Sequence, residues 1–254
     1  MSRRKTKLGP LSVMSLVREL RRGSGDPRPL AVAGARELVP LLARELRAGG
    51  DAAAVVEGLS DDAALLIWIG APDEAALQRA SRAGVPIIAV TEAESVPYVL
   101  ATDLVRVPPG AGFPVEEIAR AVARRLGEDS TSLAARLPVL RGPVCEELIL
   151  AFSKRNGLIA AAVFIPGVDM PVLTVNQIRL VLRIGLAFGE ELDRARGLEL
   201  LGVVGAGLGF RAVARELLEV IPVAGWAVKG AVAYTGTRAV GEAALLHFGA
   251  RAQR

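Results

Sequence analysis

The sequence predicts two domains of different class: a three-layer α/β domain with a parallel sheet, followed by a Gly-rich helical domain. Two observations predict this division. Over residues 29–127, short and continuously apolar runs alternate with helical patterns bounded by Pro or Gly. Such alternation is typical of parallel strands covered by helices on both faces. From residue 144 onward the strand pattern stops, and long helical stretches rich in Gly and Ala take its place.

The elements of the first half follow from this alternation. Residues 1–28 are expected to form a basic segment with a short helix, ahead of the α/β domain at 29–127. Pro40 lies early in the first helical pattern, so this helix is expected to start late or to kink. The expected strands are 29–34, 52–58, 63–70, 85–93 and 103–109, and the expected helices are 35–50, 71–84 and 113–127.

The second half begins after a segment, 128–143, that reads as a polar boundary and linker. Glycine weakens a helix in water, so its repeated use predicts close approach between helices, as in membrane bundles. A tight soluble bundle is the alternative. The glycines expected to pack helices within this domain, 144–249, are Gly202, Gly205, Gly207, Gly209, Gly225, Gly230 and Gly241.

Composition limits the function classes. The chain has 254 residues, of which 52% are apolar and 4% aromatic, with a net charge of +4. Few aromatics and a dispersed basic excess argue against nucleic-acid binding. The mean hydropathy of +0.40 raises the expectation of a membrane surface or a large partner interface. No uncharged apolar run reaches the ~18 residues of a spanning helix, and no signal-peptide pattern opens the sequence. The expected location is the cytoplasm or the cytoplasmic face of a membrane.

The candidate catalytic and cofactor motifs fail in detail. A phosphate-binding loop needs two spaced glycines, then Lys and Ser or Thr, but the turn after the first strand reads AVAGARELVP and supplies only Gly34. The nearest thing to a pocket is the set Gly34, Gly70 and Thr91, each at the end of a predicted strand. A single Cys, Cys145, and a single His predict no catalytic site and no metal site. No cofactor is therefore expected.

Two other features have structural explanations. The run GVVGAGLGF lacks the spacing of a dinucleotide fingerprint and is interpreted as packing glycines. Asp169 interrupts an apolar region just before a predicted helix. We expect it to cap that helix rather than to act as a functional carboxylate.

The second half resembles the domain of unknown function 697 family, a helical module related to the bacterial YcjF inner-membrane proteins. The stretches that carry the resemblance are IPGVDMP, NQIRLVLRIGLAFGEEL and the Gly-rich segment from LLGVVGAGLGF to GEAALLHF, about 100 residues in all. In that family the module often follows a small GTPase domain, and some members are membrane proteins. The resemblance implies that residues 29–127 form a GTPase-like domain that lacks the phosphate-binding, magnesium-binding and base-reading motifs.

The sequence thus predicts a non-catalytic protein that acts as a membrane-associated or scaffold protein, with a membrane surface, a second copy or another protein as partner. Two alternatives stay open. One is a nucleotide-binding regulator with an altered pocket, and the other is a soluble homo-oligomer held by its Gly-rich helices.

Overall fold

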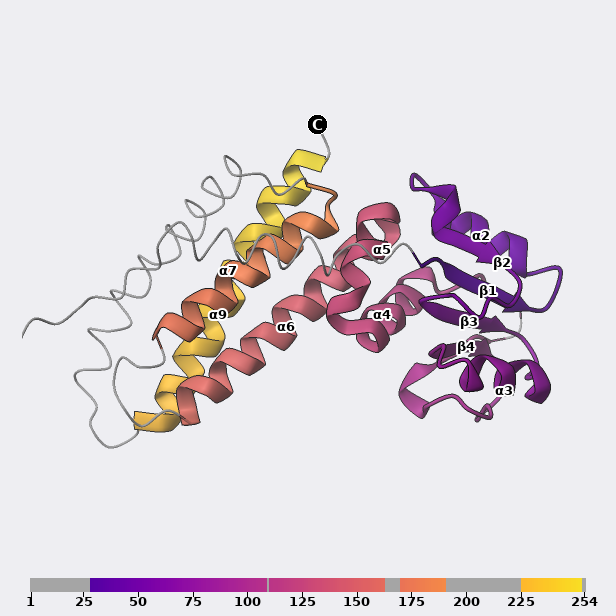
Figure 1. Cartoon of the computed structure of the whole chain (residues 1–254), viewed down its shortest axis with the longest axis horizontal. Coiled ribbons are helices and arrows are strands. Elements are labelled where there is room, and N and C mark those ends of the chain that lie inside the picture. Colours follow the sequence, from indigo (N-terminus) through magenta and orange to yellow (C-terminus); the bar gives the residue numbers. More distant parts are fainter. Residues whose placement is uncertain (1–27, 109, 163–169, 191–224, 253–254) are drawn as a thin grey trace, which may run out of the picture. The chain divides into compact units, whose positions relative to one another are not determined.

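The computed structural model describes residues 28–108, 110–162, 170–190 and 225–252. The chain divides between Glu147 and Leu148 into two compact units, an α/β unit and a helical unit. Five short strands and three helices around them make up most of the α/β unit, and long helices make up the described part of the helical unit (Figure 1).

The α/β unit is built on a five-stranded sheet in the order β2-β1-β3-β4-β5, with every neighbouring pair parallel. This confirms the predicted parallel sheet. The order is that of a flavodoxin-like doubly wound sheet, in which the direction of the connections reverses beside the first strand. The strands are β1 (Leu30–Gly34), β2 (Val55–Glu57), β3 (Leu65–Ile69), β4 (Ile87–Thr91) and β5 (Leu104–Arg106).

Three helices cover the sheet: α2 (Val39–Arg47), α3 (Glu74–Arg82) and α4 (Val115–Leu126). Because the β1–β2 and β3–β4 connections run in opposite directions, right-handed crossovers place α2 and α3 on opposite faces. Leu77 and Ala80 of α3 accordingly pack in a cluster with Ala31, Leu66 and other side chains of a single sheet face. The layered arrangement follows from strands that are apolar on both sides.

Local sequence explains where these helices begin. Asp73 caps α3 by accepting hydrogen bonds from the backbone N–H groups of Ala75 and Ala76. The first turn of α2 contains Pro40, and the helix starts only at Val39. The late start expected from this proline is confirmed, since Pro lacks the N–H that a helix interior requires.

The expectation of a linker at 128–143 is wrong. Its polar start forms a 3₁₀ turn (Gly127–Ser130), followed by α5 (Thr131–Arg136) and the first part of α6 (Pro138–Ala162). The hydroxyls of Ser130 and Thr131 donate to backbone carbonyls three residues earlier, so polar residues that suggested a loop instead start a helix. The overlooked signal is helical spacing of leucines that the structure buries, namely Leu133, Leu137 and Leu140.

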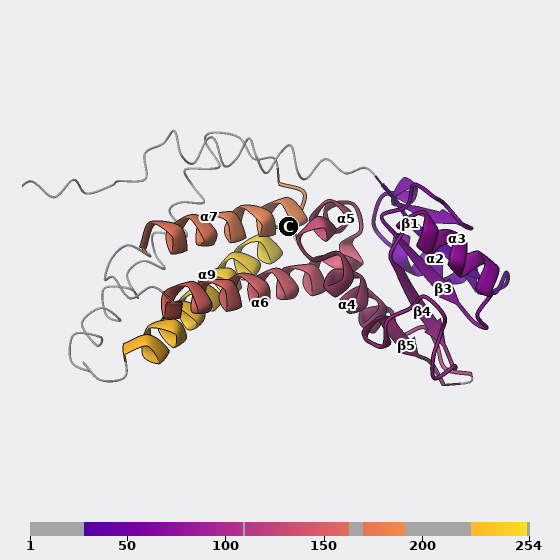
Figure 2. The same cartoon turned by 60° about the horizontal axis from the view of Figure 1, so that its bottom comes forward.

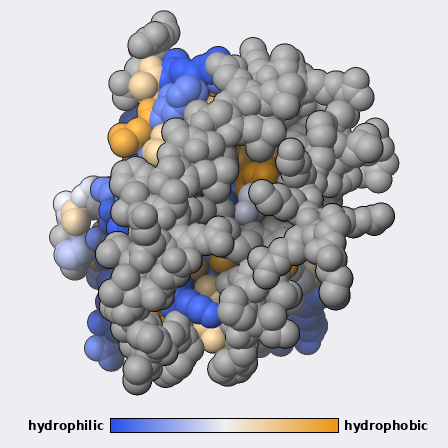
Figure 3. Space-filling model, turned by 90° about the vertical axis from the view of Figure 1, so that its left-hand side faces the viewer, coloured by the Kyte–Doolittle hydropathy of each residue, from blue (hydrophilic) through white to orange (hydrophobic). Residues whose placement is uncertain are grey.

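The helical unit is formed by the later part of α6 together with α7 (Met170–Ala187) and α9 (Gly225–Ala252) (Figure 2). Aliphatic and aromatic side chains from all three helices are buried, among them Phe152, Ile184 and Phe248. Hydrophobic and hydrophilic side chains lie side by side where described atoms are visible in Figure 3. Within the described ranges, no helix combines the length and the apolar character needed to cross a membrane.

Several sequence predictions fall outside the described residues. They are the basic segment up to residue 27, Asp169, and the glycines Gly202, Gly205, Gly207 and Gly209.

Candidate functional site

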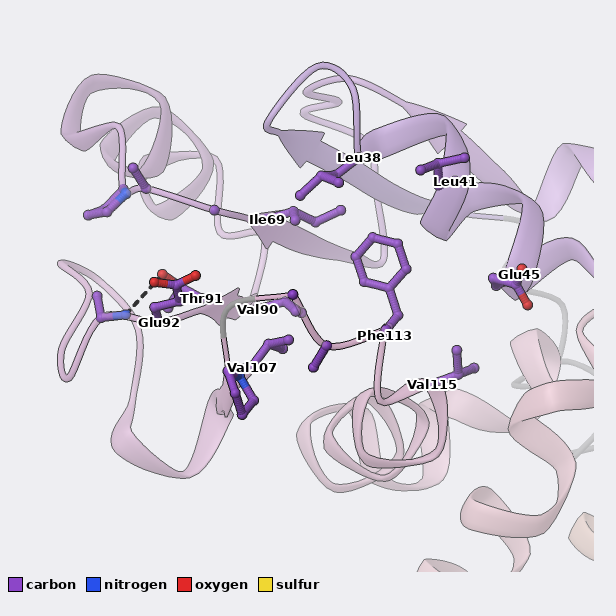
Figure 4. Close-up of a pocket in the computed structure, with 18 of the residues that line it drawn as sticks. Leu38, Leu41, Glu45, Ile69, Val90, Thr91, Glu92, Val107, Phe113 and Val115 are labelled. Atoms are coloured by element: carbon purple, nitrogen blue, oxygen red, sulfur yellow. Dashed lines mark hydrogen bonds between the residues drawn. The ribbon is translucent and has the colours of Figure 1, made fainter.

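The candidate site is a pocket of about 940 Å³ at the carboxyl edge of the sheet in the α/β unit (Figure 4). Its walls come from α2 and from the segments that follow β3, β4 and β5. Ligands of doubly wound sheets bind at this edge, because the loops that follow the strands diverge there and leave a crevice. The volume is at the upper end of the range for small-molecule sites.

The walls of the pocket are mainly hydrocarbon. The ring of Phe113 lies near the centre of the close-up, with Leu38 and Leu41 on one side of it and Val90 of the sheet on the other (Figure 4). A ligand here would gain contact area by burying apolar surface rather than by hydrogen bonding. The apolar side chains that line it include Leu38, Leu41, Ile69, Val90, Val107, Phe113 and Val115.

Backbone amides at this edge are already engaged by neighbouring strands. The N–H of Ala35 donates to Ile69 O at 2.9 Å, and the N–H of Gly70 donates to Val90 O at 2.9 Å. The N–H of Val107 donates to the carbonyl of Thr91 at 3.2 Å. A phosphate-binding loop instead directs consecutive free N–H groups at its ligand. The amides directly after β1, β3 and β5 are therefore not available as a phosphate cradle.

The predicted pocket residues are only partly brought together. Gly70 and Thr91 line the pocket, whereas Gly34 is not among its lining residues. Gly34 instead packs against β3, since a Cβ placed on it would lie 2.1 Å from Ile69 O. The Thr91 hydroxyl accepts a hydrogen bond from the N–H of Ala93 at 3.2 Å, which stabilises the turn after β4.

The two helices that begin beside the pocket are poor anion sites. Helix N-termini attract anions through exposed N–H groups and the helix dipole. In α2, Pro40 supplies no N–H, and Glu37 lies just before the helix. In α4, Glu116 and Glu117 occupy the first turn and offset the positive end of the dipole.

Sequence reasoning missed the aliphatic side chains that form the walls. Leu38 and Leu41 belong to the helix expected over residues 35–50 and were assigned no role at a site, but 39% and 44% of their surface is exposed beside the pocket. Phe113 was assigned only to the start of a helix. The available signal was the segment PPGAGF, a Gly- and Pro-rich loop carrying an aromatic residue immediately after the last strand.

The helical unit contains a second group of polar side chains, which is buried. Asn156 of α6 donates from Nδ2 to Thr237 Oγ1 of α9 at 2.9 Å and accepts at Oδ1 from Asn176 Nδ2 of α7 at 2.8 Å. Gln177 Nε2 donates to the same Thr237 oxygen at 3.1 Å, and that hydroxyl donates to Ala233 O. This polar network, made of Asn156, Asn176, Gln177 and Thr237, joins three helices.

Glycines of the helical unit lie where two helices meet. A Cβ on Gly230 of α9 would lie 3.1 Å from Gly157 O of α6, and one on Gly157 would lie 3.2 Å from Gly230 O. A Cβ on Gly241 would lie 2.6 Å from Ile149 Cγ1. The sequence reasoning had not selected Gly157, nor Gly185, which packs under the ring of Phe248. Gly225 is the first residue of α9.

The reactive side chains considered in the sequence do not form a site. Burial, and then the charge of Glu146, raises the pKa of the Cys145 thiol to about 12, so the thiolate is not formed at neutral pH. His247 packs edge-on against Phe248, with ring centroids 5.2 Å apart. In the described part of the chain, no three His, Cys, Asp or Glu side chains are grouped so that they could hold a metal ion.

Comparison of the chain with models of protein families, with curated proteins and with solved structures gives no match.

Proposed function

We propose that this protein is a non-catalytic, membrane-associated or scaffold protein, in which a GTPase-like α/β domain without nucleotide binding is joined to a helical association module. The observation that carries the proposal is the set of three interstrand hydrogen bonds at the carboxyl edge, from the N–H groups of Ala35, Gly70 and Val107. Nucleotide phosphates bind to free amides and cationic side chains at this position. Here these three amides are engaged, and the guanidinium among the described lining residues, Arg44, lies beside Glu45.

The helical unit supports the association role. Each of its three described helices exposes a large apolar side chain: Leu158 of α6 is 71% exposed, Val172 of α7 is 48% exposed and Leu246 of α9 is 74% exposed. Exposed apolar side chains are favoured where a protein contacts a membrane surface or another protein. The resemblance to the domain of unknown function 697 family points in the same direction.

Nucleotide binding is tested by calorimetric titration of the full chain with GTP or ATP in the presence of Mg²⁺. No heat of binding and no phosphate release are expected. Binding with a micromolar dissociation constant would instead support the alternative of a nucleotide-binding regulator with an altered pocket.

Association is tested by sedimentation with anionic vesicles and by light scattering without vesicles. We expect the chain to sediment with the vesicles or to show the mass of an oligomer. Vesicle binding by a monomer supports the membrane role, while an oligomer that ignores vesicles supports the alternative of a homo-oligomer. A monomer that stays in the supernatant overturns both.

A further inference from the structure

The pocket in the α/β unit has a distinctive distribution of charge. Among the described residues that line it, the charged ones are Arg44, Glu45 and Glu92. Arg44 lies 3.6 Å from the carboxylate of Glu45, and 75% of its side chain is exposed. Glu92 and Glu45 are drawn toward the two ends of the close-up, with the apolar walls between them (Figure 4). The described lining therefore carries two carboxylates and one guanidinium, a net charge of −1, and Arg44 and Glu45 offset each other at one end. Glu92 supplies the carboxylate at the other end.

This distribution opposes an anionic ligand. A carboxylate or phosphate in the pocket would meet Glu92 and Glu45, and the adjacent helix starts add Glu37 and the acidic first turn of α4. Like charges repel one another at the protein surface too, although solvent weakens the repulsion there. The amides of Ala35, Gly70 and Val107, which could otherwise offset this repulsion, are engaged by neighbouring strands.

The same features complement an organic cation. An ammonium group is attracted both to carboxylates and to the face of an aromatic ring, and Phe113 lies in the pocket with its ring between the apolar walls (Figure 4). The hydrocarbon part of the ligand would lie against Leu41 and its neighbours, since apolar walls bind apolar surface. Neither feature depends on the absence of nucleotide chemistry, so the inference goes beyond the proposed scaffold role.

We propose that the pocket lined by Leu41, Phe113 and Glu92 binds a small organic ammonium compound, with hydrocarbon against the walls and positive charge toward the carboxylates. Trp68 offers a reporter, because its indole N–H donates to the carbonyl of Ala71, a residue of the pocket wall, at 2.9 Å.

The test uses three probes with the same hydrocarbon part: 4-phenylbutylamine, 4-phenylbutanol and 4-phenylbutyrate. Each is titrated into the full-length Trp226→Phe protein, in which Trp68 is the only remaining tryptophan, and is followed by fluorescence and calorimetry. The amine is expected to bind about tenfold more tightly than the butyrate, with the alcohol between them, as one or two exposed charge interactions allow. A butyrate that binds as tightly as the amine overturns the proposal.

Two variants and a control locate the binding. Leu41→Gln is expected to lower the affinity for all three probes about fivefold or more, because it replaces exposed hydrocarbon of the wall with an amide. Glu45→Gln with Glu92→Gln should remove most of the preference for the amine while keeping the alcohol affinity. Leu100→Gln is the matched control, since Leu100 is 56% exposed in the same unit but does not line the pocket.

The outcomes separate this inference from the proposed function. No binding of the amine, or equal weakening by Leu41→Gln and Leu100→Gln, overturns the inference and leaves the scaffold role standing. Binding of GTP to the same protein overturns the absence of nucleotide binding, whatever the amine does.

Discussion

The two units hold their buried polar side chains in different ways. In the α/β unit, Thr91, Ser130 and Thr131 bond to backbone groups two or three residues away. In the helical unit, the hydrogen bonds of Asn156 to Asn176 and to Thr237 join residues 20 and 81 positions apart. The bonds of these uncharged buried side chains thus set local turns in the first unit and helix pairing in the second. The buried carboxylate of Asp103 in the α/β unit pairs instead with Arg125, at 3.4 Å.

This difference follows from what each unit can use to fix its arrangement. Parallel strands specify their neighbours through a backbone ladder and a fully apolar surface. The apolar residues of α6 and α9 are spread around each helix instead of forming one stripe, so hydrophobic burial alone leaves their register weakly defined. Buried polar hydrogen bonds and close glycine contacts help to fix the register of these helices, as single polar core residues do in coiled coils.

The largest effect is expected from Gly34→Ala in the α/β unit. A Cβ at this position would lie 2.1 Å from Ile69 O, and the backbone φ of +119° already disfavours an L side chain. Because backbone atoms cannot move aside cheaply, we expect a loss of more than about 3 kcal/mol in the free energy of unfolding. The measurement is urea unfolding followed by Trp68 fluorescence in the Trp226→Phe background.

Gly58→Ala is the control for this prediction. Gly58 also has a positive φ, +97°, but no atom lies within 4 Å of the added Cβ. Gly58→Ala should therefore lower the free energy of unfolding only through backbone strain, by about 1–2 kcal/mol. Equal losses for the two variants would show that the contact with β3 is not the reason for glycine at position 34.

The second effect concerns the helical unit, where Gly230→Leu should separate α9 from α6. The added side chain would meet Gly157 O and Ala161 Cβ at the helix contact. Overpacking of this kind costs about 1–3 kcal/mol. Helical circular dichroism during urea unfolding measures it, with Gly236→Leu as the matched control because a Cβ on Gly236 meets nothing within 4 Å. A larger loss in the control would contradict the assignment of Gly230 to a close contact.

The sequence predicted local elements more fully than it predicted the contacts between them. The alternation of apolar strands and Pro- or Gly-bounded helices predicted all five strands and the three helices that cover them, because each element carries its pattern locally. The glycine-rich composition predicted close helix contacts, yet it did not select Gly157 or Gly185. The partner of a glycine is set by tertiary packing, which has no local period.

The candidate site was less accessible to sequence reasoning for the same reason. Gly70 and Thr91 were found because strand ends can be read from the pattern. Leu41 and Phe113 were missed, since an apolar residue on a helix or loop looks the same whether it packs inside or lines a pocket. The prediction of a linker at 128–143 was wrong, because the polar residues of this segment begin a helix.

The third effect tests the polar network directly. Asn156→Leu removes the acceptor of Asn176 Nδ2 and the donor to Thr237 Oγ1 in a buried setting. Leaving buried polar groups without partners should cost about 1–2 kcal/mol and weaken the protection of α7 amides against hydrogen exchange. Thr235→Val is the control, because Thr235 is exposed to solvent and its hydroxyl donates to a backbone carbonyl of the same helix, that of Ala231. If Asn156→Leu stabilises the unit and keeps its exchange protection, the network does not define helix pairing.

The smallest effect is expected from a surface ion pair of the α/β unit, Asp61 with Arg79. Two hydrogen bonds from the guanidinium, at 3.0 and 2.8 Å, hold the pKa of the Asp61 carboxyl below its ordinary value. The unfolded state therefore takes up a proton at higher pH than the folded state does. The stabilisation is present above about pH 4 and disappears as the pH falls through the lower, folded-state pKa. Both side chains are more than half exposed, so solvent and salt screen the pair.

The difference in urea midpoint between the wild type and Asp61→Asn should thus be small above about pH 5, shrink below about pH 4, and fall further in 1 M salt. Asp62→Asn, at the exposed neighbouring position, is the control for removing one negative charge. If Asp61→Asn lowered stability as much as Asn156→Leu does, or kept its full effect at pH 2, the proposed difference between the two units would be wrong. Polar side chains would then stabilise the α/β unit as strongly at its surface as they stabilise the helical unit in its interior.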